Sequence, residues 1–537
     1  MDRSDGGSTQ TFLHRGHNYA LVLAGLAVVL IIVMAPMSEL GCDESAWAVS
    51  VGKLLHGRVL GAGAVLAKGP YLVLAHLIPY VIFGPNVFAL HLINTLWALA
   101  VGALVCVMAH RIAGRWGTVA GAVLYIGGMA DPFLRFNFYA ETIFMLPLAA
   151  GMLLVVSGIE RKRPGAIFFA GLLGGMAVLV KQTSAVAVLA MVVALWLAPG
   201  RREWKDATKK SLTLLAGSII AAVPWAIYQV AFRDGSGDPG MVDTAVGYLS
   251  QMDLPQALAN LQWTALHVLP RYSIVILTSL AGLHLLYHTW RRSRADGGEG
   301  DIGGTWAAVI GLWYLAAVAA IASTGRFSAH YFNQFIPVAA LAGGVWAADA
   351  LAGGLKRRRI AGAALVAQAV LVVIFAIVGV TGWTEALATT REPTEWREVG
   401  RYLREHTTPD DTVFVWGDQT EVVYWAGREL AARNPWITNR IIGYRHLLPV
   451  FAERIDEEID WPVLVEHLET WWPRYVVVAP RVRTVPPDDT CNYGTEDLPE
   501  LKRILRQHYE RETTIRGYEL WRRTPQAPQP AVEGEGR

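Results

Sequence analysis

The residues best suited to chemistry lie in a polar stretch near the start of an otherwise apolar chain. Asp43 and Glu44 come directly after one apolar segment, and Lys68 stands directly before another. A carboxylate at the edge of a bilayer can act as a general base on a hydroxyl group, and a lysine nearby can bind a phosphate. The stretch 38–70 therefore predicts an active site at a membrane surface.

Other ionisable residues lie in the short connections between later apolar segments. A lysine at the end of a membrane span often reaches the lipid headgroups, so contact with lipid phosphates is the alternative for each cation. Cations and carboxylates collected on one face of a helix bundle would instead suit a phosphate held at the membrane surface. These further candidates are Arg135, Glu141, Lys181, Arg326 and His330.

The composition is that of a membrane protein. Of 537 residues, 53% are hydrophobic and 17% are charged, whereas soluble proteins carry about 25% charged residues. A helix needs roughly 20 apolar residues to cross a bilayer. Residues 71–84 are shorter and contain Pro79, which predicts a juxtamembrane or re-entrant helix. Eleven spans are predicted at 19–37, 87–110, 117–132, 141–159, 165–181, 183–199, 211–231, 271–290, 304–323, 331–351 and 360–382.

The distribution of Lys and Arg predicts the orientation of these spans. The basic residues gather in every second connection, as the positive-inside rule describes for cytoplasmic loops. This places the tail 1–18 in the cytoplasm and the first outer loop, 38–86, outside. The span 19–37 is too long for a signal peptide and reads as a retained anchor. The sequence therefore predicts an integral protein, of a bacterial plasma membrane, whose C-terminal part is extracytoplasmic.

The composition changes after about residue 383. Apolar residues recur at helical spacing after Thr394, and 412–416, 474–479 and 518–521 read as strands. This alternation predicts a small α/β domain over 384–524, followed by a disordered tail at 525–537. The predicted fold class is a polytopic α-helical membrane protein, with a transmembrane domain over 19–383 and a C-terminal extracytoplasmic α/β domain.

Several kinds of chemistry lack their usual sequence signals. There is no P-loop, no GxSxG, no HExxH and no CxxC motif, which removes nucleotide hydrolases, serine hydrolases and zinc proteases. Three cysteines are too few for a disulfide framework, although a Cys42–Cys491 bridge stays open. Gly171 and Gly175 form a GxxxG pattern that indicates close helix packing.

The order of these motifs resembles that of a known family, the GT-C glycosyltransferases. The resemblance is to the family 39 group, which includes protein O-mannosyltransferases and the aminoarabinose transferase. It rests on Asp-Glu after the first span and a lysine before a short apolar helix. It also rests on FYAET at 138–142, VLVKQTSA at 178–185, GRFSAHYFNQFIPVAALAGG at 325–344 and the segment 395–429.

The resemblance implies a role for each matching residue. Asp43 matches the catalytic aspartate, Glu44 matches the neighbour that orients the loop or the acceptor, and Lys68 matches the lysine at the donor phosphate. Glu141 matches a second acidic position, while Lys68-Gly69-Pro70 departs from the Lys-Pro-Pro of many members. The proposed substrate-binding set is Glu44, Lys68, Arg135, Glu141, Lys181, Arg326, His330 and Tyr331.

The predicted function is an inverting glycosyltransferase, of the hexosyl or pentosyl type. Asp43 would deprotonate an acceptor hydroxyl, which would displace a polyprenyl phosphate from the sugar. A transporter or flippase of a lipid-linked glycan precursor is the alternative, although such proteins place ionisable groups inside their spans. The expected partners are a polyprenyl-phosphate-linked sugar, a protein, lipid or glycan acceptor and membrane lipids, with no nucleic acid. No metal-ligand cluster is evident, although a divalent cation is an open possibility for this family.

Overall fold

The structure is a computed structural model. It describes residues 25, 40–58, 68–131, 139–198, 204–231, 254–295, 302–387, 394–417, 419–432, 465, 468–480 and 499–528. Apart from Gly25, the predicted anchor 19–37 lies outside the described residues, as do Arg135 and Cys491.

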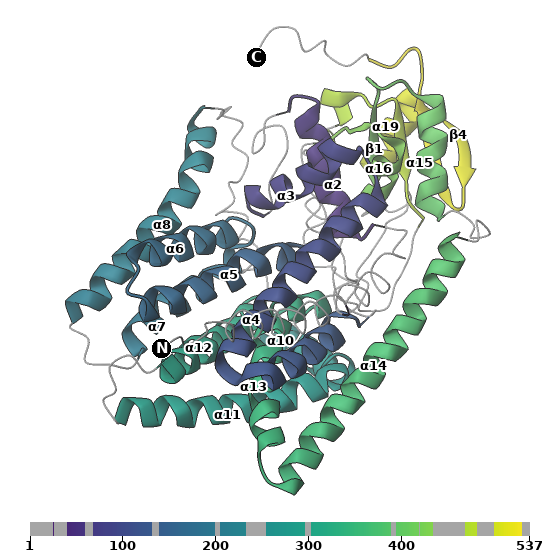
Figure 1. Cartoon of the computed structure of the whole chain (residues 1–537). Helices are drawn as coiled ribbons and strands as arrows, with labels where there is room; N and C mark the ends of the chain where they lie inside the picture. The colour runs from purple at the N-terminus through teal and green to yellow at the C-terminus, as the bar shows by residue number, and fades with distance from the viewer. Residues whose placement is uncertain are drawn as a thin grey trace, which may run out of the picture. The chain divides into compact units, whose positions relative to one another are not determined.

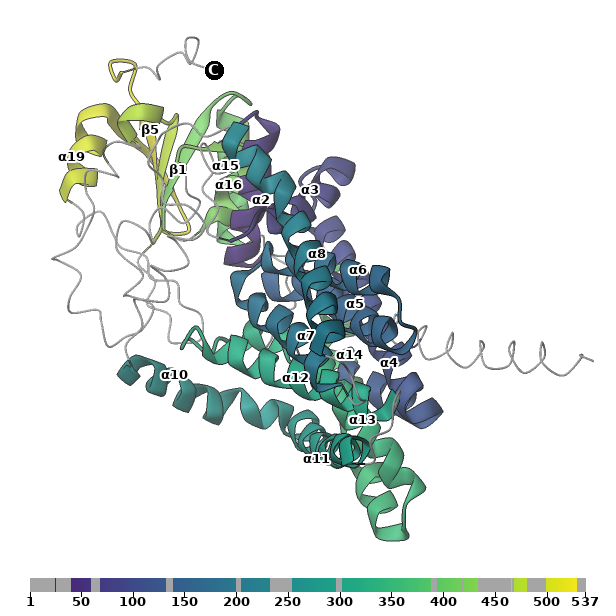
Figure 2. The ribbon, with the colours of Figure 1, turned by 90° about the vertical axis from the view of Figure 1, so that its left-hand side faces the viewer.

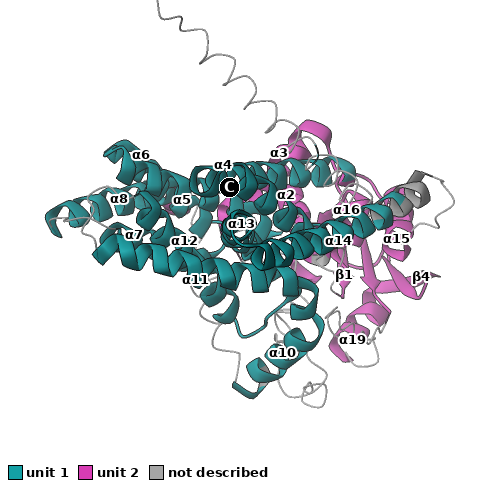
Figure 3. Cartoon of the chain, turned by 60° about the horizontal axis from the view of Figure 1, so that its bottom comes forward, with its two compact units in different colours: residues 1–38, 88–224, 254–389 teal, residues 39–87, 225–253, 390–537 magenta. Residues whose placement is uncertain are grey.

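The chain forms two compact units, coloured separately in Figure 3. A helical unit contains residues 1–38, 88–224 and 254–389, and a sheet unit contains residues 39–87, 225–253 and 390–537. The segment that the sequence assigned to the first outer loop, 38–86, thus clusters almost entirely with the C-terminal part of the chain.

The helical unit consists of long apolar helices and short 3-10 turns (Figure 1). Each of the ten spans predicted between 87 and 382 coincides with a helix or with half of one. Six of the described helices are long and apolar enough to cross a membrane. The elements are α4 (Val87–Met129), α5 (Ala140–Glu160), α6 (Pro164–Val178), η2 (Gln182–Ser184), α7 (Ala185–Leu197), α8 (Trp204–Ala231), α10 (Leu254–His267), η3 (Leu269–Tyr272), α11 (Ser273–Ala295), α12 (Ile302–Ala322), η4 (Ala329–Gln334), α13 (Ile336–Ala352) and α14 (Leu355–Leu387).

Two of the predicted spans are the two halves of α4. The helix breaks at Gly114, whose φ of 63° and ψ of −155° lie outside the helical region. Such a combination is essentially restricted to glycine. The break separates the spans predicted at 87–110 and 117–132.

Small residues let neighbouring helices of this unit approach closely. A Cβ on Gly171 would collide with the carbonyl of Leu214, and one on Gly217 would collide with that of Phe168. The GxxxG pattern of α6 therefore packs against α8, as the sequence predicted. A Cβ on Gly282 would likewise meet Ala342, so α11 and α13 lie side by side, as Figure 2 shows.

The sheet unit contains a five-stranded mixed sheet with the strand order β2-β1-β3-β5-β4. The first three strands are parallel, and β5 pairs antiparallel with β3 and β4. Helices α15 and α16 lie on one side of the sheet and α19 on the other (Figure 2). The bounds are α15 Glu395–His406, β1 Thr412–Trp416, α16 Thr420–Ala426, β2 Glu429–Leu430, β3 Tyr475–Val478, α19 Pro499–His508, β4 Tyr509–Ile515 and β5 Tyr518–Arg523.

Two helices from the N-terminal part complete the sheet unit. They are α2 (Cys42–Leu55) and α3 (Pro70–Phe83), and α2 contacts α3, α16 and β2. The segment that carries Asp43 is therefore a helix packed against the C-terminal domain. Every residue from Glu44 to Val51 is buried, which explains why α2 shows only a weak amphipathic pattern in the sequence.

Candidate functional site

Asp43 and Glu44 lie in the first turn of α2 and have different surroundings. Glu44 is fully buried, and its Oε2 accepts a hydrogen bond of 3.3 Å from the backbone N–H of Gly41. A carboxylate in this position accepts a hydrogen bond from a free backbone N–H at the helix start and interacts favourably with the helix dipole. Glu44 therefore fixes the start of the helix, while the side chain of Asp43 stays 32% exposed.

Lys68 and Asp43 form an ion pair, with Nζ 2.9 Å from Oδ2. Lys68 also lies over the ring of Trp47, with Nζ 5.3 Å from its centroid. Because both members of the pair are partly exposed, they can be reached by a substrate. Gly69 precedes α3 with φ −72°, a backbone open to any residue, so the departure from Lys-Pro-Pro imposes no special conformation here.

A buried tyrosine of the C-terminal domain lies close to Glu44. Burial, together with Tyr80 and Glu44, raises the pKa of Tyr424 well above its ordinary value. A tyrosine phenol is protonated at neutral pH and can donate a hydrogen bond. Through Tyr424, the domain after residue 390 borders the helix that carries Asp43.

In the helical unit, Glu141 and Lys181 form a close buried ion pair. The Glu141 side chain has no exposure, and that of Lys181 is 10% exposed. Lys181 Nζ also lies 3.9 Å from the ring centroid of Tyr331, close enough for a cation–π interaction. These three predicted residues are thus brought together, with the positive charge of Lys181 balanced inside the protein.

The short helix η4 links this pair to other elements of the helical unit. Successive side chains of a 3-10 helix point about 120° apart, so three consecutive residues of η4 contact three different residues of the unit. His330 contacts Tyr139 at 4.8 Å between ring centroids, Tyr331 contacts Lys181, and Phe332 stacks with Tyr272 at 6.2 Å.

The turn before η4 carries Arg326, which is partly exposed. Helix α10 holds this turn, because Asn260 donates to the carbonyl of Gly325 at 3.1 Å and Thr264 to that of Phe327 at 3.0 Å. Gly325 and Phe327 both have positive φ, 62° and 51°. Arg326, a member of the predicted substrate-binding set, thus lies on a sharply bent turn that α10 holds in place.

An ion pair with a buried carboxylate in this unit was not predicted. Asp131 is buried, and its Oδ1 lies 3.3 Å from Nη1 of the half-exposed Arg271, the residue next to Tyr272. The sequence signal was a carboxylate that directly follows an apolar segment, as Asp43 does. Among the described residues, no group of three or more His, Cys, Asp or Glu could hold a metal ion.

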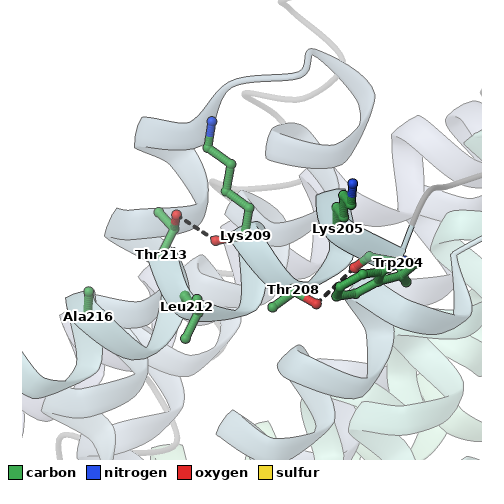
Figure 4. A pocket seen from close by; sticks show the side chains of 7 residues that line it. All are labelled: Trp204, Lys205, Thr208, Lys209, Leu212, Thr213 and Ala216. Carbon is green, nitrogen blue, oxygen red and sulfur yellow. Dashed lines mark hydrogen bonds between the residues drawn. The ribbon is translucent and has the colours of Figure 1, made fainter.

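A surface hollow at the start of α8 contains none of the predicted residues (Figure 4). Its lining comes from one helix and has no carboxylate. The hollow therefore lacks the groups that the predicted reaction needs. Its lining residues are Trp204, Lys205, Thr208, Lys209, Leu212, Thr213 and Ala216.

Comparison with known proteins supports the predicted resemblance. Residues 68–228 match the family model described as dolichyl-phosphate-mannose-protein mannosyltransferase. No curated protein sequence matches the chain significantly.

Solved structures share the fold. A crystal structure of ArnT from Cupriavidus metallidurans bound to undecaprenyl phosphate matches with a TM-score of 0.58 and 14% identity, over 95% of this chain and 99% of ArnT. The oligosaccharyltransferase AglB from Archaeoglobus fulgidus, in complex with an inhibitory peptide and a dolichol-phosphate, matches with a TM-score of 0.51 and 15% identity, over 86% of this chain and 69% of AglB.

The same oligosaccharyltransferase in complex with zinc and sulfate matches with a TM-score of 0.54 and 15% identity, over 85% and 67% of the two chains. The chain thus has a GT-C glycosyltransferase-like fold, and its predicted resemblance to that superfamily is confirmed. Together with the apolar helices, this fold makes it an integral membrane protein.

Proposed function

We propose, from the fold shared with ArnT and AglB and the family match over 68–228, that this chain is a glycosyltransferase with a polyprenyl-phosphate-linked sugar donor. The acceptor is a hydroxyl group on the extracytoplasmic side of the membrane. The observation that carries the proposal is the partly exposed Asp43–Lys68 pair at the start of α2. It joins a candidate base to a candidate phosphate-binding cation.

Asp43 acts as the general base in this proposal. Its carboxylate takes the proton of the acceptor hydroxyl while the acceptor oxygen attacks the anomeric carbon. The bond between that carbon and the phosphate oxygen breaks, and the polyprenyl phosphate leaves with the electron pair. A single displacement inverts the anomeric centre. General base catalysis contributes about a hundred- to ten-thousandfold, and a cation at the departing phosphate adds electrostatic stabilisation.

The ion pair has to open for this reaction. In an in-line displacement the base, the attacking oxygen, the anomeric carbon and the phosphate lie along one axis. Contacts of about 3 Å between successive groups put the base on the order of 10 Å from a cation at the phosphate. Asp43 and Lys68 are 2.9 Å apart. We therefore assign this contact to the resting state. When the donor binds, its phosphate pairs with Lys68, and the carboxylate of Asp43 is released.

The second cluster is proposed to serve the donor. Arg326, His330 and Tyr331 match a donor-side region of the family pattern, Glu141 matches its second acidic position, and Lys181 lies in its span-end lysine segment. Arg135 belongs to the same proposed substrate-binding set. Since Glu141 already balances the charge of Lys181, we assign that pair to holding η4 in place, and Arg326 to direct contact with the phosphate.

The proposal is tested by replacing Asp43 with asparagine. Membranes that contain the chain are supplied with a panel of radiolabelled undecaprenyl-phosphate-linked hexoses and pentoses, and label transferred to membrane material is counted. We expect Asp43→Asn to lower transfer by about a hundredfold or more, because asparagine cannot accept the proton. Binding of undecaprenyl phosphate should persist.

The matched control is Asp206→Asn, which removes the carboxylate of an i,i+4 surface pair with Lys210. This variant should transfer sugar at the normal rate. A folded Asp43→Asn protein with normal transfer would refute the role of Asp43, and no transfer from any sugar of the panel by the unmodified chain would count against the donor class.

A further inference from the structure

Helix α2 presents two different faces to the rest of the sheet unit. Asp43 and Trp47, four residues apart, lie on one face and both contact Lys68. A second, broader face carries Ser45 and Lys53, which are eight residues, or about 2.2 turns, apart. This second face meets the domain that follows residue 390. The position of Asp43 therefore depends on how the second face is held.

Near its start, α2 is held by a buried hydrogen bond between two hydroxyl groups. Ser45 Oγ lies 2.6 Å from Thr420 Oγ1, and the two residues are 375 positions apart in the sequence. Both are at most 3% exposed. Thr420 is the first residue of α16, so this bond joins the first turn of α2 to the first turn of α16.

At its other end, α2 is held by a fully buried lysine. Lys53 Nζ donates a hydrogen bond of 2.8 Å to the backbone carbonyl of Leu430, and its side chain has no exposure. Leu430 belongs to β2, the edge strand of the sheet. An edge strand has backbone groups that form no hydrogen bond with a neighbouring strand. The ammonium group of Lys53 donates a hydrogen bond to one of these groups, the carbonyl of Leu430.

Glu429 and Trp471 complete this contact. Glu429 Oε1 lies 3.7 Å from Lys53 Nζ and 2.8 Å from Arg58 Nε. The ring of Trp471 has both cations 4.7 Å from its centroid. We call Lys53, Arg58, Glu429 and Trp471 the Glu429 cluster. It gathers two cations from the α2 segment around one carboxylate and one aromatic ring of the C-terminal domain.

Stability alone does not account for ions in this position. Taking a charge out of water costs several kcal/mol, and apolar residues of similar size often stabilise as well or better. What an ionic group adds is directionality, because the charge is satisfied in one arrangement only. An apolar contact would allow α2 to pack against the sheet in several registers. Lys53, in contrast, can bind only one carbonyl and one carboxylate, and both lie at fixed positions.

We propose that the Glu429 cluster is a positioning device that sets the register of α2 and so the place of Asp43 in the proposed reaction. The C-terminal domain is then part of the catalytic apparatus, in addition to any role in choosing the acceptor. This inference rests on the proposed function for its catalytic consequence but not for its structural part. Displacing a reacting group by about 1 Å can cost up to a hundredfold in rate.

The structural part is tested without any sugar transfer. The hydroxyl oxygens of Ser45 and Thr420 are 2.6 Å apart, so we expect cysteines at these two positions to form a disulfide. The full chain, with its three native cysteines replaced by alanine, receives Ser45→Cys and Thr420→Cys, and disulfide formation is timed after addition of an oxidant. Glu429→Gln should slow this reaction at least fivefold, although position 429 is two turns of α2 away from the new bond. Arg58→Gln, at a partly exposed residue, should act in the same direction.

The matched control is Glu398→Gln, which breaks an exposed pair with Arg516 in the same domain and should leave disulfide formation unchanged. Equal rates in Glu429→Gln, Arg58→Gln and Glu398→Gln would overturn the proposal, whatever the enzyme does. If Glu429→Gln fails to fold, the Arg58→Gln result decides.

The catalytic part is tested by rescue. In the transfer assay we expect Glu429→Gln to lower kcat about tenfold or more, with the KM for the donor within twofold, because donor-binding groups are left in place. Closing the Ser45→Cys/Thr420→Cys disulfide in this variant should restore kcat to within about threefold of the value for the same chain with Glu429 intact. A loss of kcat that the closed disulfide does not relieve would overturn the positioning role.

Discussion

Asp43, Glu44 and Glu141 are carboxylates with three different surroundings. Asp43 is partly exposed and paired with a lysine, Glu44 is buried at a helix start, and Glu141 is buried against Lys181. Of the three, only Asp43 is exposed enough to meet a substrate hydroxyl once its pair with Lys68 has opened. General base catalysis needs a group within hydrogen-bond reach of the proton, so exposure separates the candidate catalyst from the two carboxylates that support structure.

The Glu141–Lys181 pair leads to a prediction on stability. Glu141→Gln should destabilise the protein by about 3–5 kcal/mol, because it leaves the ammonium group of Lys181 buried without its counter-charge. The double variant Glu141→Gln/Lys181→Met should regain most of this loss, since it removes the stranded charge. Thermal unfolding of the purified protein in detergent measures both.

An exposed pair in the same unit provides the control. Asp349 and Arg357 form a close surface ion pair, with side chains 40% and 54% exposed. Asp349→Asn should change stability by about 1 kcal/mol or less. A double variant no more stable than Glu141→Gln alone would show that Lys181 is not the source of the destabilisation.

At the scale of elements, the long apolar helices could be predicted because their length and composition carry the signal. The break at Gly114 separates two apolar runs on either side of basic residues, so both halves of α4 were predicted as spans. The strand β4 was missed because its sequence, YERETTI, is mostly charged and polar. Its pairing with β5 comes from the tight turn at Arg516 and Gly517, both with positive φ.

The break in α4 leads to a second prediction on stability. Gly114→Ala should destabilise the protein by about 1–3 kcal/mol, because φ 63° with ψ −155° is strained for any residue with a Cβ. Nothing crowds the new methyl group, so the effect is one of backbone conformation. Thermal unfolding in detergent is the measurement.

Gly311 in the middle of α12 is the matched control, because it also has open space around a built Cβ and has no positive φ. Gly311→Ala should be neutral or stabilise by up to about 1 kcal/mol. Equal effects of the two substitutions would mean that the bend at Gly114 relaxes without strain.

At the scale of the molecule, the sequence could not show that residues 39–87 pack with the domain after residue 390. The predicted boundary near 383 followed a real change in composition. The bonds that join the two segments, however, link positions such as Ser45 and Thr420 that are 375 residues apart. A pattern of neighbouring residues in the sequence cannot predict a contact between two segments so far apart. Asp43 and Lys68 could be selected from residue type and order, whereas Thr420, Leu430 and Trp471 have no sequence signal at all.

This packing changes what a truncation should do. If the C-terminal domain only selected the acceptor, a chain ending at residue 390 would still transfer sugar, to altered acceptors. Because that chain lacks Thr420, Glu429 and Leu430, which hold α2, we expect it to lose transfer to every acceptor, including hydrolysis of the donor by water. A chain ending at residue 528 keeps all the described elements of the sheet unit and should work normally. Transfer is measured with the labelled donor panel in membranes that contain equal amounts of each chain. Sugar transfer to any acceptor by the shorter chain, at a rate near that of the longer one, would show that Asp43 is placed without the C-terminal domain.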